Sequence, residues 1–280
     1  MSGNPNALAG FGGTAEGYGC GQAIELQGAT FSGARPMGQK SARLKAKGGT
    51  HWMDPRHLFV DERLRGEACV YCGALPDTVD HVPSRVFLDE PLPADIPTVN
   101  ACSICNQGFS LDEEYVACFL ECLLSGTANP DGLHRERVKR ALARNPRLAA
   151  RLGASMKSHR GTGRVWDPEL DRIRRLVLKL ARGHVACELN RPQLVGPDRV
   201  VFQPLLAMSE TERREFEGGP WGELQPWPDV GSRAFLRASQ GGGRWVEVQE
   251  GRYRYSVEET GGVLVQIVLS EYLECIVEWE

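Results

Sequence analysis

Two Cys-x-x-Cys pairs constrain this chain more than any other feature of its sequence. Cys69 and Cys72 form the first pair, and Cys102 and Cys105 form the second, with residues 73–101 between them. Each pair can close a tight turn in which two thiolates bind one tetrahedral ion, and four sulfurs with no open position suit structural Zn²⁺. The alternatives are unrelated core cysteines or redox dithiols, but a redox pair normally heads a helix in a βαβ pattern, which is missing here. The sequence therefore predicts one structural zinc site.

Composition places the chain among ordinary globular proteins. Its 280 residues, 41% of them hydrophobic, can bury a core in one large or two modest domains. The net charge of -3 gives no global sign of nucleic acid, so the local distribution of charge matters more. No apolar run predicts a membrane span, and residues 1–50 lack the pattern of a secretion signal. An odd count of nine cysteines favours metal thiolates in a reducing compartment, so we predict a cytoplasmic protein without a membrane partner.

The sequence divides into four predicted regions. Residues 1–50 are rich in Gly, Ala, Ser and Thr and are predicted to form a flexible arm. Residues 51–128 form the module that carries the cysteine pairs, and 129–164 form a basic helical segment. Residues 165–280 form an α+β domain of unknown role. The predicted fold class is thus α+β, with a zinc-stapled module, basic helices and a C-terminal antiparallel sheet.

Local patterns predict the elements of the module. Residues 78–82 form a short β-branched run that Pro83 ends, so Asp80 and His81 are expected at a strand end. Ser110, with Glu113 three residues later, is typical of a helix N-terminus. The apolar residues 115–124 then form the helix body, where Cys118 and Cys122 are predicted to be buried in the core rather than to form a second metal site.

The segment 129–164 is strongly basic and is predicted to be helical with a break at Asn145-Pro146. Such density of charge is typical of a phosphate-binding surface, although a solvated helical face is an equal alternative. With Arg85, which follows the Asp-His pair, the candidate nucleic-acid contacts are Arg135, Arg137, Lys139, Arg140 and Arg144.

The C-terminal region begins with a predicted helix at 168–189, where apolar residues recur with helical period. Short β-prone runs then predict an antiparallel sheet: 200–203, 234–238, 244–248, 253–258, 263–269 and 273–278. No catalytic constellation is visible in this half. His184, Cys187 and Trp221 are interpreted as packing residues.

Three motifs in order now bear on function. They are Cys69-Val-Tyr-Cys72-Gly73, then Thr78-Val-Asp80-His81-Val-Pro83, then Cys102-Ser-Ile-Cys105-Asn106. This combination resembles the HNH endonuclease family in its four-cysteine, zinc-bearing form. The resemblance extends from Cys69 to the end of the helix that follows the second pair, and more loosely to the extra C-terminal domain of some larger bacterial members.

The resemblance implies a ββα-metal fold, in which two antiparallel strands and a helix are pinned together by zinc. It implies that His81 is the general base, and that Asp80 and Asn106 bind one catalytic divalent ion. These roles make chemical sense, because a neutral imidazole accepts a proton at about pH 7. An ion bound by Asp and Asn oxygens keeps open positions for phosphate oxygens and matches Mg²⁺ or Mn²⁺ better than a second zinc.

The sequence departs from the family pattern at the middle motif position, where an Asn normally orients the catalytic His. Asp95 and Asn100 are the nearby candidates, and either can serve; an Asp can accept the imidazole N–H and raise the basicity of His81. The acidic run Asp112, Glu113 and Glu114 is interpreted as a helix start that complements the helix dipole.

The leading hypothesis is a metal-dependent endonuclease that hydrolyses phosphodiester bonds, with DNA as the expected substrate. The main alternative is a zinc-stapled nucleic-acid-binding module without hydrolysis, and a third is a ribonuclease. Sequence preference, strand preference and oligomeric state are left open by the sequence.

Overall fold

The computed structural model describes residues 68–159, 163–218, 228, 230–259 and 261–280. Within these ranges the chain is α+β, with helices α1 to α6 and a five-stranded antiparallel sheet, as the sequence predicts at this level. The predicted arm at 1–50 and Trp221 lie outside the described residues. None of the helices in the described ranges is long and apolar enough to cross a membrane.

The described part begins with a small hairpin followed by a long helix. Strands β1 (Thr78–His81) and β2 (Thr98–Ala101) pair antiparallel, with Asp80 opposite Val99 and His81 opposite Thr98. The 3-10 helix η2 (Arg85–Phe87) lies in the connection, and α1 (Ser103–Ser125) follows β2. Because side chains alternate along a strand, Asp80 faces the interior while Val79 and His81 share the opposite face.

Helix α1 begins seven residues before the predicted start at Ser110. The sulfur of Cys102 caps it by accepting a hydrogen bond from the Cys105 N–H at 3.4 Å, so the second cysteine pair itself forms the helix N-terminus. Ser110 lies inside the helix and donates to the Gln107 carbonyl, as hydroxyls inside helices often do. Cys118 and Cys122 are buried in its core face, as predicted.

The basic segment forms two helices and then a hairpin. Helices α2 (Glu136–Arg144) and α3 (Pro146–Ser155) follow the 3-10 helix η3 (Pro130–Gly132). They break at Asn145, as predicted, because Asn145 caps α3 through its side chain and Pro146 cannot continue α2. The end of the segment is not helical: β3 (Met156–His159) and β4 (Gly163–Trp166) pair antiparallel.

The C-terminal half consists of one long helix and the main sheet. Helix α4 (Leu170–Leu189) matches the predicted helix closely. The sheet has the order β5-β9-β8-β7-β6 with antiparallel neighbours throughout. Its strands are β5 (Arg199–Pro204), β6 (Val246–Gln249), β7 (Tyr253–Glu259), β8 (Val263–Leu269) and β9 (Leu273–Trp279).

Two helices in the C-terminal half depart from the sequence prediction. Helix α6 (Arg233–Ser239) replaces the strand predicted at 234–238, because Ser232 caps it by accepting from the Phe235 N–H and Arg237 pairs with buried Glu188 on α4. Helix α5 (Glu210–Gly218) was not predicted and follows the 3-10 helix η4 (Leu205–Ala207).

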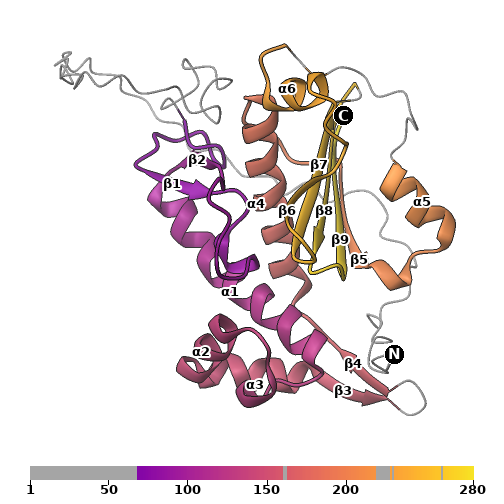
Figure 1. The fold of residues 1–280 in the computed structure, drawn as a ribbon. Coiled ribbons are helices and arrows are strands. Elements are labelled where there is room, and N and C mark those ends of the chain that lie inside the picture. Colours follow the sequence, from indigo (N-terminus) through magenta and orange to yellow (C-terminus); the bar gives the residue numbers. More distant parts are fainter. Residues whose placement is uncertain (1–67, 160–162, 219–227, 229, 260) are drawn as a thin grey trace, which may run out of the picture.

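Helix α4 lies between α1 and the sheet (Figure 1). One hydrophobic core runs from α1, α2 and α3 through α4 to the inner face of the sheet. The region boundaries predicted at 128/129 and 164/165 therefore do not separate independent cores. A second, smaller core surrounds the cysteine pairs and includes Cys187 of α4. At Gly183 the packing is so close that an added Cβ would lie 3.0 Å from Val82, which fixes how α4 approaches the hairpin.

Candidate functional site

The four cysteines of the two pairs form one cluster. Their sulfur atoms all lie within 4.8 Å of one another, so Cys69, Cys72, Cys102 and Cys105 can hold a metal ion. The Cys72 and Cys102 sulfurs are 3.7 Å apart. The Cys105 N–H, at the start of α1, lowers the pKa of Cys102, which favours the thiolate that a metal requires. The predicted pairing of the two Cys-x-x-Cys motifs into one site is confirmed at the level of a metal-binding cluster.

Asp80 is held in a buried polar network rather than open to solvent. Its Oδ2 accepts a hydrogen bond from the Tyr71 hydroxyl at 2.7 Å and lies 2.7 Å from the Lys179 Nζ. The same Nζ lies 2.7 Å from Glu113 Oε1 and donates to the Ser84 hydroxyl at 2.5 Å. The network contacts only Oδ2 of the carboxylate. No described residue is hydrogen-bonded to Oδ1, so this oxygen can bind another ligand.

His81 ends β1 and is half-buried, on the strand face opposite Asp80. Burial lowers its pKa, and the charges of Arg85 and Lys179 lower it further against the opposing effect of Asp80. The imidazole is therefore neutral at about pH 7 and can accept a proton. This is the protonation state that a general base needs.

Asn106 lies in the first turn of α1 and reaches back to β1. Its side-chain amide nitrogen donates to the Val79 carbonyl at 3.2 Å and to the Thr78 hydroxyl at 3.4 Å. Among the described residues no partner is hydrogen-bonded to the side-chain oxygen of Asn106, so this atom can bind an ion. Helix and strand thus bring Asn106 to the hairpin that carries Asp80 and His81.

The two candidates for orienting His81, Asn100 and Asp95, lie in different parts of the hairpin: Asn100 in β2 and Asp95 in the turn before it. Asn100 lies opposite Val79 in the β-ladder, and because Val79 and His81 share a face, Asn100 is a diagonal neighbour of the histidine. Asp95 is exposed in a turn before β2. Neither side chain forms a hydrogen bond with the His81 ring among the described residues, so the expected orienting contact is not made here.

One of the predicted nucleic-acid contacts, Arg135, is buried, whereas the others are exposed or partly exposed. Arg135 forms an ion pair with Asp89 at 2.6 Å, and donates to the carbonyls of Val86 at 3.0 Å and Leu88 at 2.8 Å. Arg135 therefore joins the start of α2 to η2 and to the loop after it. Because these contacts bury its side chain, Arg135 is not exposed to a ligand.

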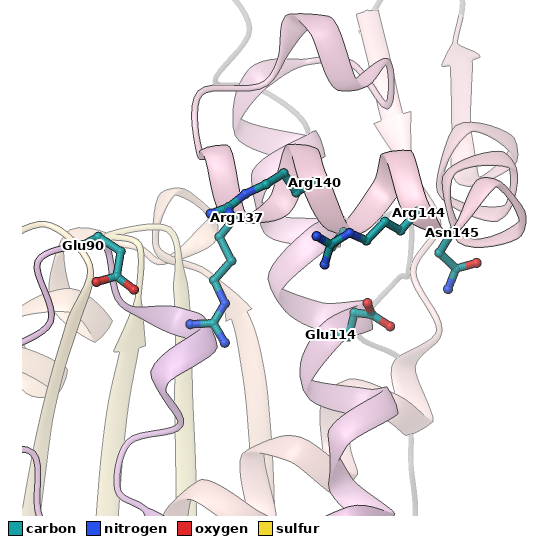
Figure 2. Close-up of a pocket in the computed structure, with 7 residues that line it drawn as sticks. Glu90, Glu114, Arg137, Arg140, Arg144 and Asn145 are labelled. Atoms are coloured by element: carbon teal, nitrogen blue, oxygen red, sulfur yellow. The ribbon is translucent and has the colours of Figure 1, made fainter.

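The remaining predicted contacts are on the surface. Arg85, Arg137, Arg140 and Arg144 are exposed, while Lys139 is partly exposed and pairs with Glu136. Three of the arginines share one face of α2 and line a cavity of about 430 Å³ with Glu114 of α1, Glu90, Ala141 and Asn145. Figure 2 shows these side chains around the hollow between α2 and α1. The Arg137 guanidinium also donates to the Arg85 carbonyl at 3.2 Å, which joins this face to the segment after His81.

Sequence reasoning missed the residues that surround Asp80. Glu113, interpreted as part of a helix start, lies in the third turn of α1 and pairs with Lys179. Asp112, interpreted in the same way, is buried against Arg172 and Arg175 of α4. One signal was present: Lys179 lies three residues after Leu176, within the apolar stripe of its helix, where a lysine needs a buried partner.

Comparisons with protein-family models, with curated proteins and with solved structures find no match for this chain.

Proposed function

We propose that this protein is a metal-dependent endonuclease of the HNH type, with a structural Zn²⁺ on the four cysteines. The observation that carries the proposal is the placement of His81 at the end of β1, with Asp80 before it in the strand and Asn106 of α1 hydrogen-bonded to the same strand. The hairpin, the following helix and the cysteine cluster support a ββα-metal module in the sense that the sequence motifs imply.

In the proposed mechanism, His81 removes a proton from the water that attacks the phosphorus atom, the bond from phosphorus to the leaving 3′ oxygen breaks, and that oxygen takes a proton from solvent water. Its lowered pKa keeps the ring neutral and ready to accept that proton. The Asp80 and Asn106 side-chain oxygens would hold Mg²⁺ or Mn²⁺, because each residue keeps one oxygen without a partner among the described residues. Such an ion supplies Lewis-acid stabilisation of charge on phosphate oxygens.

The exposed arginines of α2 support nucleic acid as the substrate. Arg137, Arg140 and Arg144 offer planar guanidinium groups on one face, and such groups bind phosphate oxygens in pairs. Arg85 extends this positive surface to within four residues of His81 along the chain. DNA is the proposed substrate, and RNA is the alternative that the assay below distinguishes.

The experiment is cleavage of supercoiled plasmid by the zinc-loaded full-length chain with Mg²⁺ or Mn²⁺. His81→Ala should abolish metal-dependent nicking while plasmid binding is retained. His134→Ala is the matched control, because His134 is an exposed histidine in the loop before α2. Nicking by the His81→Ala variant at the parental rate would disprove the assignment of the base. Labelled RNA and DNA of one sequence, incubated in parallel, identify the substrate.

A non-catalytic zinc-stapled nucleic-acid-binding module is the second candidate. The observation that favours it is the ion pair of Asp80 with Lys179, since this carboxylate already has a cation at one oxygen. Under this alternative both the parent and His81→Ala bind plasmid and neither cleaves it with any divalent ion.

A further inference from the structure

The ammonium of Lys179, on α4, is surrounded by oxygen atoms from β1, from the segment that follows β1 and from α1. Its Nζ lies 2.7 Å from Asp80 Oδ2, 2.7 Å from Glu113 Oε1 and 2.5 Å from Ser84 Oγ. The side chain is 1% exposed. The ammonium donates hydrogen bonds to Ser84 and Glu113 and forms an ion pair with Asp80, so each of the three oxygens is in direct contact with it.

The cluster contains one positive and two negative side chains, all of them largely buried. One ammonium faces two carboxylates, which leaves a net charge of about -1 among groups that water barely reaches. Loss of the ammonium alone would leave two acidic side chains close together without a counter-ion. A cation at this position is therefore required by the two acids, and the chain supplies it from a helix far along the sequence.

These contacts fix the orientation of the Asp80 carboxylate. Oδ2 is held by Lys179 and by the Tyr71 hydroxyl, and the Tyr71 ring also lies 5.8 Å from the ammonium. A carboxylate with one oxygen held from two sides cannot rotate freely, so the position of Oδ1 is set as well. Partners of this kind orient metal-binding carboxylates and change metal affinity when they are removed.

We propose that Lys179 is a positioning residue, which holds Asp80 Oδ2 so that Oδ1 is the oxygen offered to a divalent ion. This inference rests on the proposed function, in which Asp80 binds that ion. It also assigns a role to the C-terminal half: α4, packed at Gly183 against Val82 and the Tyr71 hydroxyl, completes the site from outside the cysteine-bearing module.

The test uses a variant that keeps the charge of the cluster. Lys179→Met alone would leave two buried acids unpaired and can unfold the chain, whereas Lys179→Met/Glu113→Gln removes one positive and one negative charge. A second variant, Tyr71→Phe, removes only the hydroxyl that binds Oδ2. The matched control is Arg199→Met/Glu278→Gln, which removes an exposed ion pair of the sheet.

Mn²⁺ binding to the zinc-loaded full-length chain is measured by titration calorimetry, with plasmid cleavage and thermal unfolding in parallel. The double variant should unfold cooperatively and retain its zinc, yet bind Mn²⁺ about 10- to 100-fold more weakly. Tyr71→Phe should weaken Mn²⁺ binding in the same direction by less, and the control should bind it as the parent does.

Three results overturn the inference in distinguishable ways. Parental or tighter Mn²⁺ binding by both Asp80-directed variants means that Lys179 does not position Asp80, while the proposed nuclease function survives. Weaker binding in the Arg199→Met/Glu278→Gln control as well means that the loss is not specific to the cluster. A parent that neither binds Mn²⁺ nor cleaves plasmid overturns the proposed function together with this inference.

Discussion

The side-chain amide of Asn106, in the first turn of α1, donates a hydrogen bond to the main-chain carbonyl of Val79 in β1 at 3.2 Å. This contact joins the helix that begins at the second cysteine pair to the strand that carries Asp80 and His81. It also sets the amide so that the nitrogen faces the strand. The side-chain oxygen is left for another ligand.

Asn106→Ala should therefore lose both a structural contact and a metal-binding oxygen. We expect the free energy of unfolding to fall by about 1 kcal/mol and cleavage to fall by about tenfold or more. Asn106→Asp keeps an oxygen but loses the donor, so it should retain more cleavage than the alanine variant. Gln107→Ala, an exposed change at the next position, is the control. Equal cleavage by Asn106→Ala and the parent would remove Asn106 from the site.

The cysteine cluster should bind about one zinc per chain. Cys72→Ser should reduce the zinc content measured by metal analysis and lower the unfolding temperature, because binding free energy at such a site is also folding free energy. Cys122→Ala is the matched control: this thiol is buried in α1, away from the cluster, and its loss should leave the zinc content unchanged. A native preparation without zinc would contradict the prediction.

Arg135 and Arg144 should respond in opposite ways to the same substitution. Arg135→Met removes a partly buried ion pair and leaves the Val86 and Leu88 carbonyls without their donor, so stability should fall by roughly 1–3 kcal/mol. Arg144→Met should leave stability within about 0.5 kcal/mol of the parent, because the side chain is exposed. It should instead weaken DNA binding and reduce the slope of log affinity against log salt by about 1.

Denaturant unfolding and binding titrations at several salt concentrations separate these effects. A large loss of stability in Arg144→Met, or parental stability in Arg135→Met, would reverse the assignment of the two arginines.

His184 should make stability depend on pH. The side chain is fully buried on α4, with its Nε2 2.7 Å from the Tyr253 hydroxyl and its ring stacked on Tyr255. Burial, and then the charges of Lys179 and Arg237, hold its pKa well below the usual 6.5. The unfolded chain thus binds a proton that the folded chain does not. The contribution of His184 to stability is full above the unfolded pKa and declines as the pH falls from there towards the folded pKa, by up to about 1.4 kcal/mol per pH unit.

His184→Gln should flatten this decline, since glutamine does not titrate. Unfolding free energies measured across the pH range below 6.5, with exposed His134→Gln as control, check the prediction. An unchanged slope in His184→Gln would assign the acid sensitivity to other groups.

Local sequence patterns were sufficient for much of this fold. The cysteine spacing identified one metal-binding cluster, the β-branched run ended by Pro83 identified β1, and Asn145-Pro146 identified the break between α2 and α3. The strand end and the helix break are determined within a few residues of chain, by backbone dihedrals and capping, whereas the cluster joins two tight turns that residues 73–101 separate. The start of α1 was misplaced because a cysteine rather than a serine caps it, and 234–238 was misread because α6 depends on Ser232 and on Glu188 of α4.

The chemistry around the candidate site depended on contacts that no local pattern encodes. By itself, the sequence determined that Asp80 and His81 end a strand and that two cysteine pairs converge. Only the tertiary structure decided that Lys179 faces Asp80 and that Arg135 is a buried clamp rather than a surface contact. The first outcome follows from how α4 packs against β1, and the second from how the start of α2 packs against η2 and the loop after it. A charged side chain that packing carries into the interior must find its counter-ion there, wherever in the chain that partner lies.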